Sequence, residues 1–183
     1  MKKFLLLAAA AVIAGAAGMW IGQHFRAHAL IVTPVPRAAV AGNHAVTFSL
    51  PDLHGNDRSI QDWQGKVRIV NFWATWCPPC RQEIPEFIRA QKRYGHEGLQ
   101  IIGVAVDRTS RVVAFYRARN MNYPVLLGEG AGPQLMAKYG DAEGGLPYSI
   151  ILNRQGRIVA SKLGAFTESE LTQTLKPLLK SSP

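Results

Sequence analysis

The feature that most constrains the fold of this chain is an apolar stretch that leads directly into a helical pattern, with two cysteines at the junction. Residues 67–73 are mostly β-branched or aromatic, follow Gly65, and precede the segment Trp76-Cys77-Pro78-Pro79-Cys80. From Cys77 on, the apolar residues recur at helical spacing, and the first turn of a helix tolerates prolines. The pattern predicts a buried strand followed at once by a helix, which Pro85 kinks and Gly95 ends.

The rest of the chain alternates between strand and helix patterns. A hairpin is predicted from 47–50 and 59–60, strands at 99–106, 124–127, 147–152 and 157–163, and helices at 108–120, 133–139 and 167–179. Thr167 and Glu170 have the spacing of a capping box at the start of the last helix. Because strands alternate with helices and the last two strands form a hairpin, the fold class is α/β, with a mixed central sheet and helices on both faces.

The first residues predict export. Residues 4–22 carry no charge and follow Lys2 and Lys3. As a helix they would be about 28 Å long, enough to span a bilayer, and the two lysines would keep the N-terminus in the cytoplasm. Residues 1–26 are therefore predicted to be a membrane anchor in the bacterial inner membrane. The alternative is a cleaved signal peptide, with Ala27-His28-Ala29 as its cleavage site. Residues 27–44 are predicted to be a linker, and residues 45–183 a periplasmic domain.

The charge distribution argues against a nucleic-acid partner. The net charge is +9, but four of the 21 basic residues and none of the 12 acids precede residue 45, which leaves 17 − 12 = +5 for the domain. These charges form no basic run, so no nucleic-acid partner is predicted. A metal site that includes His24, His28 and His44 is an alternative use of the N-terminal histidines.

The two cysteines are spaced for redox chemistry. At a helix N-terminus, free N–H groups and the helix dipole favour the thiolate of Cys77, which lies at an exposed position. Cys80 lies one turn further, on the core-facing side, and is the expected buried resolving thiol. Two intervening residues allow a small disulfide ring, so the pair can cycle between dithiol and disulfide. A copper or zinc site would need ligands beyond this one pair, so neither a metal nor another cofactor is predicted.

The segment from residue 67 to residue 85, which contains Asn71-Phe72-Trp73-Ala74-Thr75-Trp76-Cys77-Pro78-Pro79-Cys80, resembles the active-site segment of the TlpA/ResA branch of the thioredoxin-like superfamily. The resemblance covers about residues 45–180. It includes the N-terminal β-hairpin, a central strand-helix insertion, and Gly145-Leu146-Pro147 before the last hairpin. It implies a thioredoxin-like fold and a thiol-disulfide reductase.

The resemblance also implies roles for individual residues. Cys77 would attack the disulfide of a partner protein, Cys80 would resolve the mixed disulfide, and Pro147 would be cis. A cis proline beside the dithiol would expose the backbone of Leu146 to an extended substrate segment. Trp76, directly before Cys77, is expected to form apolar surface for the substrate, the alternative being a place in the core.

Glu83 is the predicted proton acceptor. Thioredoxin has a buried carboxylate in the strand before its dithiol, but the matching residue here is Asn71, which does not titrate. Glu83 lies three residues after Cys80, on the neighbouring turn of the same helix, and TlpA/ResA-like proteins have an acidic residue there. We therefore expect Glu83 to take the proton of Cys80. The alternative is a surface glutamate favoured by the helix dipole.

Pro78 and Pro79 remove two N–H groups that could stabilise a thiolate, which favours a reductase over an oxidase. A reductase in an oxidising periplasm needs electrons, and the resemblance implies a membrane donor of the DsbD/CcdA type. The expected substrates are disulfides of exported proteins, such as apocytochromes c or copper-site proteins. The alternatives are a periplasmic thiol oxidase and a copper-binding chaperone that uses the same thiols. A third alternative is a peroxidase of the peroxiredoxin type, but Thr75-Trp76-Cys77 does not match the Pro/Thr/Cys pattern around the reactive cysteine of such enzymes.

Overall fold

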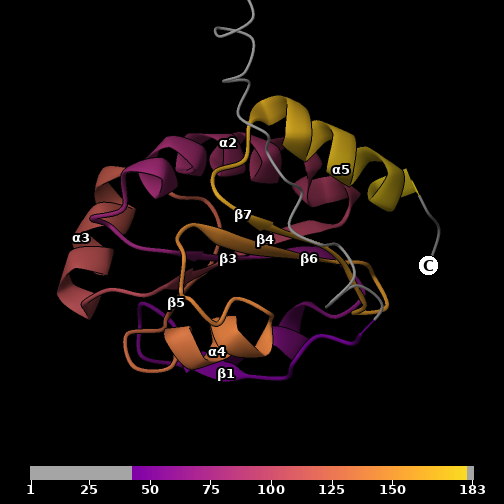
Figure 1. The fold of residues 1–183 in the computed structure, drawn as a ribbon. Helices are drawn as coiled ribbons and strands as arrows, with labels where there is room; N and C mark the ends of the chain where they lie inside the picture. The colour runs from indigo at the N-terminus through magenta and orange to yellow at the C-terminus, as the bar shows by residue number, and fades with distance from the viewer. Residues whose placement is uncertain (1–42, 181–183) are drawn as a thin grey trace, which may run out of the picture. The chain divides into compact units, whose positions relative to one another are not determined.

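A five-stranded sheet lies at the centre of the domain in the computed structural model, which describes residues 43–180 (Figure 1). The strand order is β5-β4-β3-β6-β7, with β3 (Val67–Trp73), β4 (Leu99–Ala105), β5 (Val125–Leu127), β6 (Tyr148–Leu152) and β7 (Ile158–Leu163). Strands β3, β4 and β5 are parallel, whereas β6 is antiparallel to β3 and β7 is antiparallel to β6. This confirms the predicted mixed sheet.

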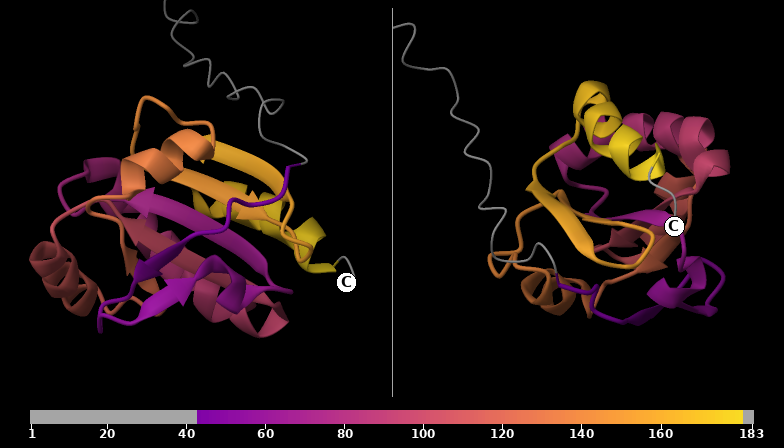
Figure 2. Two further views of the ribbon diagram at one scale, coloured as in Figure 1. Left: turned by 90° about the horizontal axis from the view of Figure 1, so that it is seen from below. Right: turned by 90° about the vertical axis from the view of Figure 1, so that its right-hand side faces the viewer.

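Helices cover both faces of this sheet, as predicted. Helices α2 (Pro78–Tyr94), α3 (Thr109–Ala118) and α5 (Glu168–Lys180) share one core with it. The other core contains side chains of α4 (Gly132–Lys138) and of the segment with β1 (Ser49–Pro51), β2 (Asp57–Ser59) and the 3-10 helix η1 (Ile60–Trp63). Two views at right angles show α5 and α4 on opposite sides of the sheet (Figure 2). The predicted central insertion is β5 followed by α4, between α3 and β6.

Strand β3 is central because it is apolar on both faces. Val67, Ile69 and Trp73 face the core under α2, whereas Val70 and Phe72 face the other core, and none of the five is exposed to solvent. A strand that is buried on both sides reads as a continuous apolar run, so its position could be predicted closely. Its C-terminal end therefore places the following loop and the start of α2 firmly against the core.

Two local predictions need correction. Ile60 was expected to continue a strand, but it begins η1, because the Ser59 hydroxyl accepts a hydrogen bond from Gln61 N–H (3.2 Å). Helix α2 ends at Tyr94 as expected, yet Gly95 keeps a right-handed conformation (φ −57°) and starts a second 3-10 helix, η2 (Gly95–Glu97). The left-handed residue is Gly98 (φ 96°), because the extra 3-10 turn postpones the reversal of the chain.

The chain enters the domain alongside the turn between β6 and β7. The N–H of Ala45 donates to the Gly156 carbonyl (2.9 Å), and the N–H of Ile158 donates to the Asn43 carbonyl (2.9 Å). The predicted anchor, most of the linker, His24 and His28 lie outside the described residues. Among residues 43–180, no helix has both the length and the apolar character needed to cross a bilayer.

Candidate functional site

The two cysteines lie at the N-terminus of α2 and are joined by a disulfide (S–S 2.08 Å, Cα–Cα 5.3 Å). Cys77 is the N-cap residue, and its sulfur accepts a hydrogen bond from Cys80 N–H (3.2 Å). Pro78 and Pro79 occupy the first helical positions and have no N–H to offer. The next donor, Arg81 N–H, binds the Cys77 carbonyl (3.2 Å) and not the sulfur.

The surroundings of the disulfide differ from the prediction in one respect. Cys80 is fully buried, as expected, but Cys77 is only 3% exposed. Cys77 was expected at the surface; it is instead bonded to Cys80 and belongs to the core under α2. The preceding Trp76 is 60% exposed, which excludes the alternative of a core tryptophan. The buried disulfide is thus directly preceded in the chain by a surface aromatic side chain.

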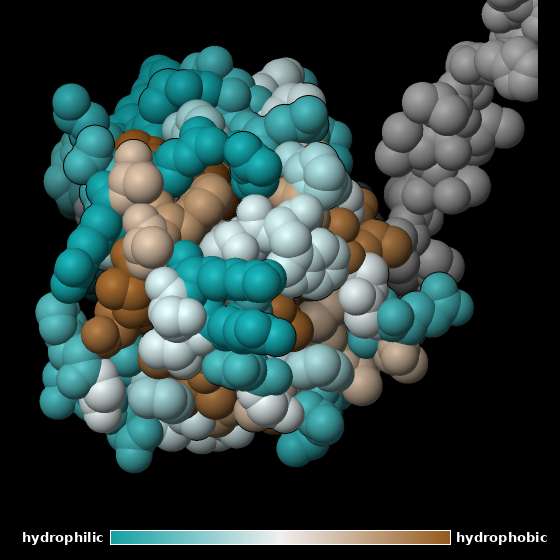
Figure 3. Space-filling model, turned by 90° about the vertical axis from the view of Figure 1, so that its left-hand side faces the viewer, coloured by the Kyte–Doolittle hydropathy of each residue, from teal (hydrophilic) through white to brown (hydrophobic). Residues whose placement is uncertain are grey.

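The Leu146–Pro147 peptide bond is cis, as the resemblance implied. Leu146 is partly buried and contacts both cores. Next to this segment lies Leu163, at the end of β7, which is 47% exposed and sits so close to Gly145 that a Cβ there would be 2.6 Å from its Cδ1. Sequence analysis missed Leu163, although an apolar residue at the end of a hairpin strand is a usable signal. A view onto the side where α3 lies shows apolar surface among polar groups (Figure 3).

A second residue that sequence analysis missed is Asp107, two residues after β4. Its Oδ2 accepts hydrogen bonds from the N–H (3.1 Å) and the hydroxyl of Thr75, and its Oδ1 accepts one from Arg108 N–H (2.7 Å). Burial raises the pKa of Asp107, but the Thr75 and Arg108 hydrogen bonds and the Arg111 charge outweigh it, so the pKa is lowered. Because β3 and β4 are parallel neighbours, an acidic residue just after β4 lies beside the loop that follows β3. The position of Asp107 after a predicted parallel strand was therefore a signal from which its contact with this loop could have been predicted.

Glu83 is fully buried beneath α2, which excludes the surface alternative. Its Oε1 accepts a hydrogen bond from Asn71 Nδ2 (2.8 Å) and its Oε2 accepts one from Phe166 N–H (3.1 Å). Burial raises the pKa of Glu83 to about 7, although these two hydrogen bonds and the charge of Lys162 act to lower it. A carboxyl with this pKa can both take and release a proton near neutral pH.

Asn71 holds Glu83 in place. It is fully buried in β3, and its Nδ2 also donates to the hydroxyl of Ser149 on β6 (3.0 Å), while its Oδ1 has no hydrogen-bond partner. The amide therefore connects the carboxyl of Glu83 to the centre of the sheet. The catalytic role of Glu83, like the substrate-binding roles of Trp76, Leu146 and Pro147, remains a prediction.

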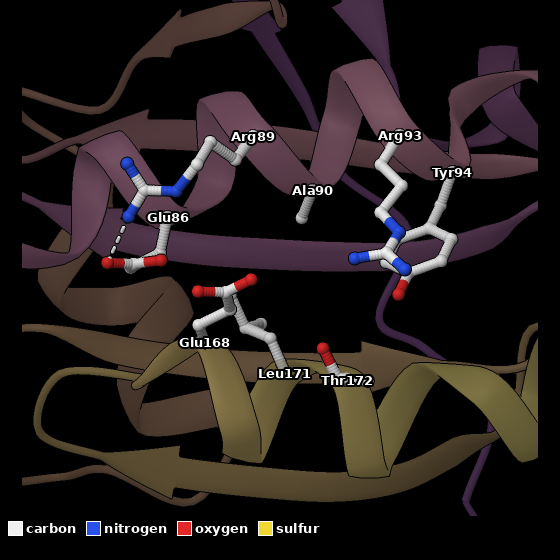
Figure 4. Close-up of a pocket in the computed structure, with 8 residues that line it drawn as sticks. All are labelled: Glu86, Arg89, Ala90, Arg93, Tyr94, Glu168, Leu171 and Thr172. Atoms are coloured by element: carbon white, nitrogen blue, oxygen red, sulfur yellow. Dashed lines mark ion pairs between the residues drawn. The ribbon is translucent and has the colours of Figure 1, made fainter.

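A groove between α2 and α5 is separate from the dithiol (Figure 4). Glu86 and Arg89 form an ion pair at its edge, and its remaining lining comes from residues further along α2 and from α5. It contains none of the predicted site residues. Within residues 43–180 no three His, Cys, Asp or Glu side chains are grouped so as to hold a metal.

Comparisons with known proteins agree with this geometry. The model of the AhpC/TSA family matches residues 41–161. The thiol-disulfide oxidoreductase ResA of Bacillus thuringiensis (strain Al Hakam) is 30% identical over 168 residues, which are 91% of this chain and 91% of that protein. The thioredoxin-like protein YneN of Bacillus subtilis (strain 168) is 36% identical over 143 residues, 73% of this chain and 78% of the relative.

A solved structure shares the fold. It is that of a putative thiol:disulfide interchange protein DsbE from Chlorobium tepidum, with a TM-score of 0.68 and 28% identity over 76% of this chain and 97% of that one. Fold, relatives and a disulfide at the start of α2 all point to exchange between thiols and disulfides as the activity. The chain therefore belongs to the AhpC/TSA family and, within it, to the ResA-like thiol-disulfide oxidoreductases of thioredoxin fold.

Proposed function

We propose that this protein is an exported, membrane-tethered reductase of disulfides in periplasmic proteins. The observation that carries the proposal is the fully buried Glu83, which follows Cys80 on α2 and has a pKa raised to about 7 by burial. A group of this kind is suited to accept the proton of a buried thiol. The uncharged residues 4–22 after two lysines support tethering in the inner membrane, with the domain in the periplasm, or export by a cleaved signal.

The reaction starts from the reduced dithiol. The thiolate of Cys77 attacks one sulfur of a partner's disulfide, the partner's S–S bond breaks, and its other sulfur leaves as a thiolate that takes up a proton. Cys80 then gives its proton to Glu83 and attacks the Cys77 sulfur, which breaks the mixed disulfide and releases the second partner sulfur as a thiolate that takes up a proton. Two electrons pass to the partner, and the product is the Cys77–Cys80 disulfide.

The hydrogen-bond donors around Cys77 support reduction over oxidation. A strong oxidant needs its attacking thiolate to be highly stabilised. Here the two prolines leave Cys80 N–H as the backbone donor to the Cys77 sulfur. Equilibrium titration of the purified full-length protein in detergent against glutathione tests this direction. A potential near that of reducing thioredoxins, about −270 mV, supports a reductase, whereas one above about −150 mV would make it an oxidase.

The proposed role of Glu83 has a direct kinetic test. Reduced protein is mixed with excess 5,5′-dithiobis(2-nitrobenzoate), so that Cys77 releases one thionitrobenzoate and the attack of Cys80 releases a second. We expect E83Q to slow the second release by about 10²-fold at neutral pH and to remove its pH dependence near 7. E86Q is the matched control, because Glu86 is on the same helix but pairs with Arg89 at the groove. An unchanged second release in E83Q would exclude the role.

Partners follow from the same chemistry. The oxidised product must be re-reduced, and in the periplasm a membrane dithiol protein of the DsbD/CcdA type is the donor we propose. The proposed substrates are apocytochromes c or copper-site proteins. C80S retains Cys77 but cannot resolve the mixed disulfide, so expression of full-length C80S should trap substrates as mixed disulfides that a thiol reductant releases. The C77S/C80S variant is the control, and equal recovery from both would contradict the proposal.

A further inference from the structure

Glu83 is fully buried, so a proton that it accepts must reach solvent through the protein. A row of polar side chains crosses the sheet beneath it. Asn71 on β3 is opposite Ser149 on β6, and Ser149 is opposite Lys162 on β7. Directly opposite residues of antiparallel strands project to the same face, so all three side chains lie on the face covered by α2 and α5. The row runs from the buried carboxyl to β7, the last strand of the sheet.

Lys162 is fixed at the outer end of this row. Its side chain is 23% exposed, and its Nζ lies 2.5 Å from Glu170 Oε1 at the start of α5 and 5.1 Å from the centre of the Phe166 ring. The N–H of Phe166 is itself the donor to Glu83 Oε2 (3.1 Å). Phe166 thus contacts the Lys162 ammonium group with its ring and the Glu83 carboxylate with its backbone N–H.

Glu170 is held as firmly as the lysine. Its Oε2 accepts hydrogen bonds from the N–H (2.8 Å) and the hydroxyl (3.0 Å) of Thr167, in the capping box that begins α5. The other carboxylate oxygen, Oε1, pairs with the ammonium group of Lys162. The ammonium group is therefore held by the Glu170 carboxylate and by the ring of Phe166, the residue whose N–H binds Glu83.

We propose that Lys162, held by Glu170, is a positioning residue that sets the proton affinity of Glu83 and so the pH range in which Cys80 is resolved. This inference rests on the proposed role of Glu83 and adds a specific regulator to it. Lys162 touches neither the substrate nor the sulfurs; it acts through the carboxyl alone.

The charges around Glu83 make Lys162 the effective regulator. The charged or titratable groups that interact with Glu83 are Lys162 of β7, which is paired with Glu170 of α5, and Tyr123 in the segment before β5. Cys80 precedes Glu83 by three residues on α2. Burial raises the pKa of Tyr123 well above 10.0, as does the charge of Glu83, so that phenol is neutral in the relevant range. The charge of Lys162 opposes the effect of burial on the pKa of Glu83. Loss of this cation should therefore favour the protonated carboxyl.

The test compares K162M, K162R and K176M with wild type, all as full-length protein in detergent. Lys176 is an exposed lysine on α5, so K176M removes the same charge at a position away from Glu83. The titration of Glu83 is followed by the carboxyl signal of 13C-labelled glutamate, assigned by its absence in E83Q. The second release of thionitrobenzoate gives the pH profile of resolution in the same samples.

We expect K162M to raise the titration midpoint of Glu83 by about one pH unit and to slow the second release about tenfold on the acid side of the midpoint. K162R and K176M should stay at the wild-type midpoint, and the first release, from Cys77, should be unchanged in all three. A midpoint in K162M equal to that in K176M would overturn the inference and leave the role of Glu83 intact. If the midpoint moves but the profile of the second release does not, the role of Glu83 itself is wrong.

Discussion

At the scale of single residues, Glu83 combines burial, which raises the pKa of its carboxyl, with hydrogen bonds to both oxygens, which lower it. It is buried on α2, yet both of its oxygens accept hydrogen bonds, one from Asn71 and one from Phe166. Burial without these donors would keep the group protonated at neutral pH, and the donors without burial would keep it ionised. The combination keeps both protonation states accessible in the pH range in which the enzyme is expected to work.

The protonation of Glu83 should make folding stability depend on pH. Burial raises its pKa from 4.5 to about 7, so the unfolded chain loses this proton at lower pH than the folded protein. The stabilisation is complete below 4.5 and is lost as the pH rises through about 7, by about 3 kcal/mol in total. Urea unfolding of the oxidised protein between pH 4 and 8 should show this decline in wild type and E86Q but not in E83Q. Parallel curves for wild type and E83Q would contradict it.

Trp76 should matter for protein substrates and not for small ones. It is 60% exposed and directly precedes the buried Cys77, so it can contact a bound polypeptide. We expect W76A to lower kcat/KM for insulin reduction about tenfold, the effect of losing one aromatic contact, and to leave the reaction with 5,5′-dithiobis(2-nitrobenzoate) unchanged. L163A should show a smaller effect of the same kind. An equal loss with both substrates would assign Trp76 to the dithiol itself.

At the scale of elements, the loop between β3 and α2 is held from outside by the segment after β4. Asp107 accepts both hydrogen bonds that Thr75 donates to it, through the backbone and through the hydroxyl. The two strands are parallel neighbours, so their C-terminal ends are fixed to one another before either loop begins. The start of α2 is thereby held on one side by its own strand and on the other by Asp107.

This arrangement predicts a graded loss of stability. T75V removes the hydroxyl but keeps the size of the side chain, and it should lower the free energy of unfolding by about 1 kcal/mol. D107N should cost more, because an amide cannot accept from all the donors that face Asp107 and leaves one of them unpaired. Urea denaturation of the oxidised protein measures both. T172V, on α5, is the control, and equal stability of T75V and T172V would show that the Asp107 contact does not fix the loop.

The elements themselves could largely be predicted from the sequence. The predicted bounds of β3 match the structure, because a strand buried on both faces is mostly apolar, here in five of its seven residues. The capping box of α5 was also found, since Thr167 and Glu170 interact locally. By contrast, η1 was missed, because a single 3-10 turn has no period of its own.

The site was predictable only as far as it is local. Cys77, Cys80 and Glu83 share one helix, and their relation follows from helical spacing. Asp107, Leu163 and Lys162 reach the site through strand pairing and register, which fold-level contacts decide. The burial of Cys77 was missed for a similar reason: it depends on packing against core residues of other elements, which helical spacing does not show.

At the scale of the whole molecule, the chain has only two cysteines, so the proposed export can be tested by thiol labelling. In C80S the remaining thiol is Cys77. We expect a membrane-impermeant maleimide added to intact spheroplasts to label full-length C80S after mild reduction, and to miss a C80S chain that starts at residue 43. Full-length C80S that is labelled only after lysis would contradict a periplasmic domain.

The way in which the chain enters the domain has a mechanical consequence. Residues 43–45 are hydrogen-bonded beside the start of β7, whereas Leu163, next to the cis-proline segment, ends the same strand. A six-residue strand is about 20 Å long, so residues 43–45 and Leu163 lie at opposite ends of β7. If the domain is tethered through its N-terminus, as proposed, the tether therefore joins it about 20 Å from Leu163 and leaves the cis-proline segment open to a partner.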